Sequence, residues 1–444
     1  MTRSTRSLRH LKGVLMVLNL LLGQTLRFEG DPFQKPWQEV THHRQDGAVL
    51  IKDGYIKKVG GRGELLSNFP TARVTDYGGD LIVPGFIDAH VHYPQTAIIA
   101  SWGKRLIDWL NFYTFPEEVR LSDPIYAEQV ANCYLDLALA HGTTTMASFC
   151  TTAPTSVTAY FEAAAMRGMR VVGGKTCMDR NAPKELIDTP QRAYDESKEL
   201  IDEWHGKGRA IYAITPRFSP TSTPDQLEAL GALWAERPEC LMQTHLSEQF
   251  EEIAWVQDLF PTAIDYLDTY ERYGLLGPRS VYGHSIHLKP REINRLSEVG
   301  ASVVHCPTSN TFIGSGLFDL MGLSKAKVSL GLASDIGGGS NFSMLRTMAA
   351  TYEIAQLQGK VLHPAQLLWL ASEGSAKALH LDGKVGHLGP KIEADICVLN
   401  LNSTNAIDQR VKNANDFWET LFPTIMMGDD RAVRQVWIAG RTVD

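Results

Sequence analysis

The stretch LIVPGFIDAHVH, residues 81–92, joins an apolar run to two histidines. Continuous apolar runs of this length are typical of strands that are buried on both faces, as in parallel sheets. Alternate side chains of a strand point to the same side, so His90 and His92 are expected to face the same way. The stretch therefore predicts a buried strand that ends in a pair of imidazoles.

Further apolar runs repeat this pattern, each followed by a longer segment with helical spacing. The eight expected strands cover residues 81–88, 143–149, 170–175, 210–216, 241–245, 280–284, 301–305 and 328–335. They span about 255 residues, close to the usual ~250 residues of a (β/α)8 barrel. We therefore expect an α/β protein whose main part is a TIM barrel.

The two chain ends differ from this pattern, because they contain short strand-like runs and turns. Residues 47–56 include the hairpin signal Asp53-Gly54, and residues 394–399 and 433–443 read as further strands. Neither end is long enough to form a good core alone, so we expect one small composite β-sandwich domain. The expected division is 13–80 and 381–444 for this domain and 81–380 for the barrel.

Composition excludes several classes of protein. The 444 residues are 44% hydrophobic and 21% charged, which indicates a globular chain. A net charge of −7 argues against nucleic acid as a partner. Six cysteines without a C-x-x-C pair fit reduced thiols and a cytoplasmic location. Basic residues within 1–12 precede an apolar run, the layout of an export signal, but the uncharged stretch 13–26 is too short to span a membrane. We expect no membrane partner, and a first strand behind a ragged tail.

Three more potential metal ligands end predicted barrel strands, namely His245, His284 and Asp335. Active sites of such barrels form at the carboxyl ends of the strands, so these side chains should meet the two histidines of the first strand. His245 or His284 alone could instead cap its strand through a hydrogen bond to the backbone, but together these groups predict a metal centre. Residues 210–216 contain no lysine that could be carboxylated to bridge two metals. One metal is therefore the simpler inference.

Two further groups suit a reaction on a planar ring. Glu248 lies three residues after His245, so it reaches the metal only if the chain leaves extended geometry near Leu246. There it could shuttle a proton, although a solvated acid at a helix start is equally compatible with the sequence. Arg217 and Phe218 could hold a carbonyl-bearing heterocycle, or form a rim ion pair and a core ring.

These residues resemble the amidohydrolase superfamily and, within it, the barrel-type guanine deaminase family. The motifs that carry the resemblance are VPGFIDAHVH (83–92), DWLNFYTFP (108–116), KTCMD (175–179), TPRFS (215–219), HCPTSN (305–310) and ASD (333–335). In the last motif, Ser334 stands where the family more often has threonine. The resemblance implies a zinc-dependent hydrolysis of guanine to xanthine and ammonia, and a homodimer.

The resemblance also implies roles for individual residues. The zinc ligands would be His90, His92, His245 and Asp335. The catalytic groups would be Glu248 as proton shuttle, His284 close to the attacking water, and Asp335. The substrate contacts would come from Gln95, Arg217, Phe218, His245 and Glu248. Ligand chemistry alone does not separate zinc from iron.

Other functions remain open at this point. A related amidohydrolase could act on 8-oxoguanine, another aminated purine or a triazine. A catalytically inactive barrel could serve as a scaffold, but a scaffold has no need for the full set of site groups. The thiolate-liganded zinc deaminases carry P-C-x-x-C, which this sequence lacks.

Overall fold

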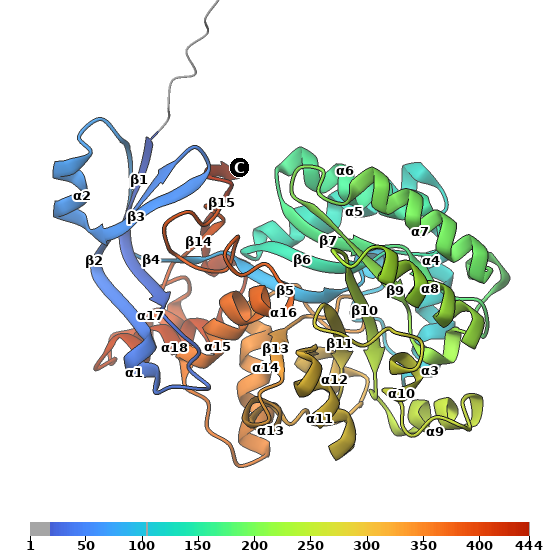
Figure 1. Ribbon diagram of the computed structural model, residues 1–444. Helices are drawn as coiled ribbons and strands as arrows, with labels where there is room; N and C mark the ends of the chain where they lie inside the picture. The colour runs from blue at the N-terminus through green and yellow to red at the C-terminus, as the bar shows by residue number, and fades with distance from the viewer. Residues whose placement is uncertain (1–17, 104, 444) are drawn as a thin grey trace, which may run out of the picture.

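The computed structural model describes residues 18–103 and 105–443. It consists of a barrel and a smaller sheet, and Figure 1 shows the blue N-terminal and red C-terminal strands together on one side of the barrel. Residues 1–12, with their export-signal pattern, and the expected domain start at residue 13 lie outside the described residues. None of the helices in the described part is both long enough and apolar enough to span a membrane.

The barrel confirms the predicted fold class. Its eight parallel strands pair in the order β13-β12-β11-β10-β9-β7-β6-β5, and the short β8 pairs with β9. The strands are β5 (Phe86–Val91), β6 (Thr143–Phe149), β7 (Arg170–Gly174), β8 (Thr176–Cys177), β9 (Ala210–Pro216), β10 (Leu241–Leu246), β11 (Ser280–His284), β12 (Ser302–His305) and β13 (Ser329–Leu332). Every residue of β6 and of β10 is buried, as expected for strands covered on both faces.

Helices cover the barrel strands, and several begin at strong start signals. Asp123, Thr189 and Thr223 each accept a hydrogen bond from the backbone of the first turn and precede a proline at the first helical position. The longer helices are α5 (Pro124–Ala140), α6 (Pro154–Arg167), α7 (Pro190–Trp204), α8 (Pro224–Glu236), α9 (Phe250–Leu259), α11 (Pro290–Val299), α14 (Met344–Leu357) and α18 (Phe417–Met427). The shorter ones are α1 (Trp37–Val40), α2 (Arg62–Asn68), α3 (Leu106–Trp109), α4 (Phe115–Arg120), α10 (Asp268–Glu271), α12 (Pro307–Phe312), α13 (Leu320–Lys325), α15 (Pro364–Trp369), α16 (Ser375–Ala378) and α17 (Asn405–Val411).

The small domain combines strands from both chain ends, as predicted. One seven-stranded sheet runs in the order β16-β15-β14-β4-β1-β2-β3. Its strands are β1 (Leu18–Phe28), β2 (Thr41–Lys52), β3 (Tyr55–Gly61), β4 (Arg73–Pro84), β14 (Ile396–Leu399), β15 (Val433–Ile438) and β16 (Arg441–Val443). The predicted hairpin turn joins β2 to β3, where both Asp53 and Gly54 have positive φ.

The predicted start of the first barrel strand, at residue 81, was wrong. Residues 81–84 end β4 and pair with β14 in the small sheet, and the barrel strand β5 begins only at Phe86. The apolar run continues across the change of sheet because the last four residues of β4 and all of β5 are buried, so hydrophobicity gives no sign of it. Gly85 lies at this change, and its backbone N–H donates to the carbonyl of Asp395 at 2.9 Å.

Replacing Gly85 by Ala is expected to destabilise the protein. A β carbon built there would lie 2.8 Å from Cβ of Thr144, a branched side chain in β6 that cannot turn away. We expect a loss of about 1–3 kcal/mol in the free energy of unfolding. Gly63→Ala is the control, because a β carbon at this exposed position in α2 meets nothing within 4 Å. An unchanged melting temperature for Gly85→Ala would contradict the expectation.

Two arginines of the barrel hold the segment that leads into β14. Arg170 donates from Nε to Oε2 of Glu393 at 2.8 Å, and Arg209 donates to the same oxygen at 3.0 Å. Arg209 also donates from Nη1 to Oδ1 of Asp395 at 3.1 Å. Burial alone would raise the pKa of Glu393, but the hydrogen bond from Arg170 and the charge of Arg209 lower it below 4.5.

Stability should therefore depend on pH through Glu393. A lowered folded-state pKa gives stability that is present above 4.5 and is lost as the pH falls through the folded pKa. We expect Glu393→Gln to cost about 1–3 kcal/mol at pH 7. The gap between the melting temperatures of wild type and variant should shrink as the pH falls below 4.5. A gap that is constant over this range would exclude the carboxylate as its source.

Candidate active site

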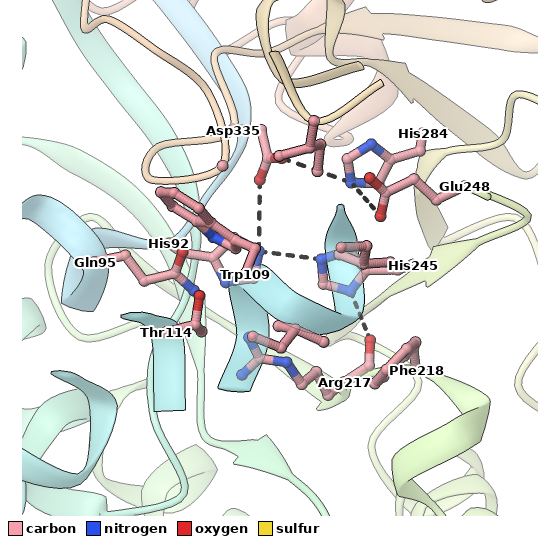
Figure 2. Close-up of a pocket in the computed structure, with 14 residues that line it drawn as sticks. His92, Gln95, Trp109, Thr114, Arg217, Phe218, His245, Glu248, His284 and Asp335 are labelled. Atoms are coloured by element: carbon pink, nitrogen blue, oxygen red, sulfur yellow. Dashed lines mark hydrogen bonds and ion pairs between the residues drawn. The ribbon is translucent and has the colours of Figure 1, made fainter. Parts of the chain in front are cut away.

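The predicted site residues meet at the carboxyl ends of the barrel strands. His90 lies in β5 and His92 directly follows it, while His245 lies in β10 and His284 ends β11. Asp335 lies three residues beyond β13, in a loop and not in the strand predicted for residues 328–335. Figure 2 shows His92, His245, Glu248, His284 and Asp335 pointing toward a common centre.

Three imidazoles and one carboxylate could hold a metal ion. Ring nitrogens of His90, His92 and His245 all lie within 4.8 Å of one another. Oδ1 of Asp335 lies 3.3 Å from Nε2 of His90 and 3.5 Å from Nε2 of His92. Among the described residues, the buried Nε2 of His90 makes no hydrogen bond. Because an unpaired buried nitrogen is costly, the group fits a bound cation.

A hydrogen bond fixes the orientation of His245. Its Nδ1 donates to the backbone carbonyl of Arg217 at 2.6 Å, so Nε2 keeps its lone pair. That atom lies 3.0 Å from Nε2 of His92. Burial and neighbouring histidines hold the pKa of His92 and of His245 well below 6.5, so both rings stay neutral, the form that binds metals.

A second group of possible ligands, His90, His284 and Cys306, is less suited to a cation. One ligand atom from each lies within 4.8 Å of the others. Burial raises the pKa of the Cys306 thiol well above its ordinary value of 9.0, and a metal binds the thiolate. The imidazole and carboxylate group is therefore the better candidate.

The backbone brings Glu248 into the site as the sequence required. After β10, Ser247 adopts the left-handed conformation with φ of 50°, which ends the extended geometry. Glu248 is consequently buried, and its Oε2 lies 3.6 Å from Nε2 of His284. The helix-start role belongs to Glu252, whose Oε2 accepts hydrogen bonds from the backbone N–H groups of Glu248 and Gln249. Glu248 is thus not a solvated acid.

The carboxylates of the site differ in their pKa values. Burial raises the pKa of Glu248 to about 7, against the charge of His284. Burial would also raise the pKa of Asp335, but the contact with His90 and the charge of His284 lower it to about 2. Burial opposes the protonation of His284, yet Glu248 and Asp335 outweigh it and raise the pKa of its ring. One carboxyl can therefore exchange protons near neutral pH while the other stays ionised.

Ser334, the departure from the family motif, helps to hold Asp335 in place. Its backbone N–H donates to Oδ1 of Asp88 at 2.9 Å, and its hydroxyl donates to Oδ2. Asp335 itself has a φ of 53°, a conformation that turns its side chain out of the line of the strand. The hydroxyl of Ser334 therefore anchors the residue next to the proposed ligand Asp335.

Gln95, Arg217 and Phe218 lie in the wall of the same cavity. The cavity is also lined by His92, His245, Glu248, His284 and Asp335. Gln95 lies in the short helix η1 (Tyr93–Ile98), and Arg217 and Phe218 directly follow β9. The structure thus brings the predicted site residues to one place, and His90 belongs to the ligand cluster although it does not line the cavity.

One wall of the cavity was not predicted from the sequence. Leu106, Trp109, Leu110 and Thr114 line it from α3 and from η2 (Leu110–Thr114). The Oγ1 atom of Thr114 is buried and has no hydrogen-bond partner among the described residues. These residues fall in or beside the motif at 108–116, which the sequence singled out without giving it a task.

Comparisons with known proteins agree with this geometry. The amidohydrolase family matches residues 81–443. A guanine deaminase of Escherichia coli strain K12 is 44% identical over 400 residues, covering 90% of this chain and 91% of the relative. A probable guanine deaminase of Deinococcus radiodurans is 40% identical over 426 residues, covering 94% and 97%.

A solved structure gives the same result for the fold. The structure of an E. coli guanine deaminase superposes with a TM-score of 0.94 at 41% identity, and the match covers 96% of this chain and 99% of that one. The family match, these identities and the metal-ligating geometry agree. The chain belongs to the amidohydrolase family.

Proposed function

We propose that this protein is a metal-dependent guanine deaminase, which hydrolyses guanine to xanthine and ammonia. The observation that carries the proposal is that Arg217 and Gln95 line the same cavity as Glu248 and the histidine cluster. A base held by Arg217 and Gln95 therefore lies beside Glu248. The similarity to curated guanine deaminases over about nine-tenths of the chain supports this substrate.

The metal proposed for the site is zinc. His90, His92, His245 and Asp335 would hold it, since neutral imidazoles and one carboxylate are usual zinc ligands. A bound zinc ion lowers the pKa of water and so makes a hydroxide nucleophile available at neutral pH. Metal analysis of the purified protein by mass spectrometry would separate zinc from iron.

Glu248 and Asp335 would move the protons. Asp335, whose pKa is about 2, is ionised and can accept a proton from the attacking water. Glu248 can give its proton to the ring nitrogen beside C2 of guanine, then take the proton of the new C2 hydroxyl and pass it to the leaving amine, because its pKa of about 7 suits both giving and taking a proton. The proton that Asp335 took from the water then returns Glu248 to its starting state. The hydroxyl of Ser315 donates to Oε1 of Glu248 at 2.8 Å and so leaves Oε2 for this exchange.

Arg217, Gln95 and Phe218 would select the base. The guanidinium can donate to the purine carbonyl, the amide can bind another ring edge, and the phenyl ring can contact the base. A base without the carbonyl leaves N–H groups of the buried guanidinium, beyond the one bonded to Glu118, without an acceptor, so adenine should bind poorly.

Ammonia release from guanine, 8-oxoguanine, adenine and cytosine, measured side by side, tests the substrate. We expect guanine to be preferred, with xanthine as product. Arg217→Ala should lower kcat/KM for guanine by about 100-fold and leave the metal content unchanged. Turnover of a different ring with guanine inert would favour the related amidohydrolase activities, and inactivity on all four would favour a scaffold.

A homodimer and a cytoplasmic location are further proposals. All six cysteines are free thiols, and five of them are buried, which suits a reducing compartment. Light scattering on the purified protein would test the dimer, and fractionation of the cells that make it would test the location.

A further inference from the structure

Glu118 joins two of the residues that would bind the base. Its Oε1 accepts a hydrogen bond from Nε2 of Gln95 at 2.8 Å, and its Oε2 accepts one from Nη1 of Arg217 at 2.7 Å. Glu118 is 1% exposed, and both partners are buried as well. We propose that Glu118 is a positioning residue that orients Gln95 and Arg217 for the base, an inference that rests on the proposed function.

The carboxylate determines which way the amide of Gln95 points. An ionised carboxylate only accepts hydrogen bonds, so the NH2 group of Gln95 must face Glu118. Its carbonyl oxygen then lies on the other side, 3.4 Å from the backbone N–H of Gly337. The NH2 group and the carbonyl oxygen of Gln95 therefore have fixed positions in the cavity wall, and the hydrogen-bonding groups on one edge of a base can complement them.

The segment 115–118 holds the guanidinium of Arg217 from two directions. The carboxylate of Glu118 accepts a hydrogen bond from Nη1, and the centroid of the Phe115 ring lies 5.4 Å from the guanidinium carbon. Both residues belong to α4, which overlaps the end of the motif at 108–116. In the described part of the chain, Glu118 is the carboxylate that pairs with Arg217. Its removal would leave a buried positive charge without a partner.

The backbone of Arg217 contacts one of the proposed metal ligands. Its carbonyl accepts the hydrogen bond from Nδ1 of His245, so one residue serves both the ligand cluster and the base. The carboxylate of Glu118 bonds the side chain of Arg217 and not the carbonyl that holds His245. A change at Glu118 should consequently weaken base binding while the metal ligands keep their places.

The test compares Glu118→Gln with the matched control Glu117→Gln. Glu117 is the preceding residue of α4 and is also buried, but its carboxylate bonds Arg120 and Tyr126. For each protein, KM and kcat are measured with guanine, and inhibition constants with xanthine, which keeps the carbonyl, and with 2-aminopurine, which lacks it. Metal content and melting temperature are measured in parallel.

We expect Glu118→Gln to raise KM for guanine and the inhibition constant of xanthine by about 10- to 100-fold. The inhibition constant of 2-aminopurine should change by less than about threefold, since no carbonyl contact is lost with it. Kcat should fall less than KM rises, metal content should stay at the wild-type level, and Glu117→Gln should leave all the binding constants unchanged.

The outcomes separate this inference from the proposed function. If the wild type deaminates guanine but Glu118→Gln weakens xanthine and 2-aminopurine equally, or matches Glu117→Gln, the role of Glu118 is overturned and the function stands. If the wild type does not deaminate guanine, the function falls, and calorimetry with xanthine decides the role of Glu118. A wild type that neither deaminates guanine nor binds xanthine would overturn both the proposed function and the role of Glu118.

Discussion

Glu248→Gln is expected to lower kcat for guanine by about 10²- to 10⁴-fold while the protein keeps its metal. The amide has nearly the same size and can still accept a hydrogen bond from Ser315, so the loop after β10 should keep its shape. It cannot give and take a proton, and the carboxyl group that it replaces has a pKa of about 7. The measurement is ammonia release at saturating guanine, together with metal analysis.

Glu251→Gln is the matched control for this prediction. Glu251 lies three residues further along, is exposed, and forms an ion pair with Arg105 at 2.9 Å. Its replacement should change kcat by less than about twofold, since surface ion pairs contribute little. A Glu248→Gln protein that binds guanine and zinc and keeps near-normal turnover would show that another group moves the proton.

Removal of the metal is the second change with a large expected effect. Protein treated with a chelator should release ammonia from guanine at less than about 1% of the untreated rate, because water is a poor nucleophile at neutral pH without a metal. Adding zinc back should restore the rate. His245→Ala should weaken metal binding by more than about 100-fold, since it removes a ligand and not merely a neighbour of one.

His141→Ala provides the comparison. His141 follows α5, outside the ligand cluster, and its ring bonds the carbonyl of Leu137 at 2.8 Å. This variant should bind metal and release ammonia as the wild type does. Full activity of the chelated protein, confirmed to be free of metal, would contradict the metal requirement.

The strand ends explain why much of the site could be predicted. In a parallel barrel the carboxyl ends of all strands meet, so histidines that end separate apolar runs must converge. His90, His245 and His284 followed from this rule alone. Glu248 required more, because its approach depends on the left-handed conformation of Ser247, which serine does not signal as glycine would.

Contacts between distant segments could not be predicted from patterns. Glu118 and Arg217 are 99 residues apart, and nothing in the spacing of either segment indicates the other. The division of the apolar run at Gly85 was equally hidden, because the residues on both sides of it are buried. Periodicity reports whether a side chain is buried, but it does not report which layer of the protein buries it.

The composite small sheet has a consequence for the synthesis of the protein. β4 pairs with β14, so its partner leaves the ribosome more than three hundred residues later. At a synthesis rate of ~5–20 residues per second, this edge of β4 stays unpaired for about 15 to 60 seconds. An unpaired edge is a template for aggregation. A nascent chain that stops before residue 396 would already contain every residue of the candidate active site, yet it would be a substrate for chaperones and proteases.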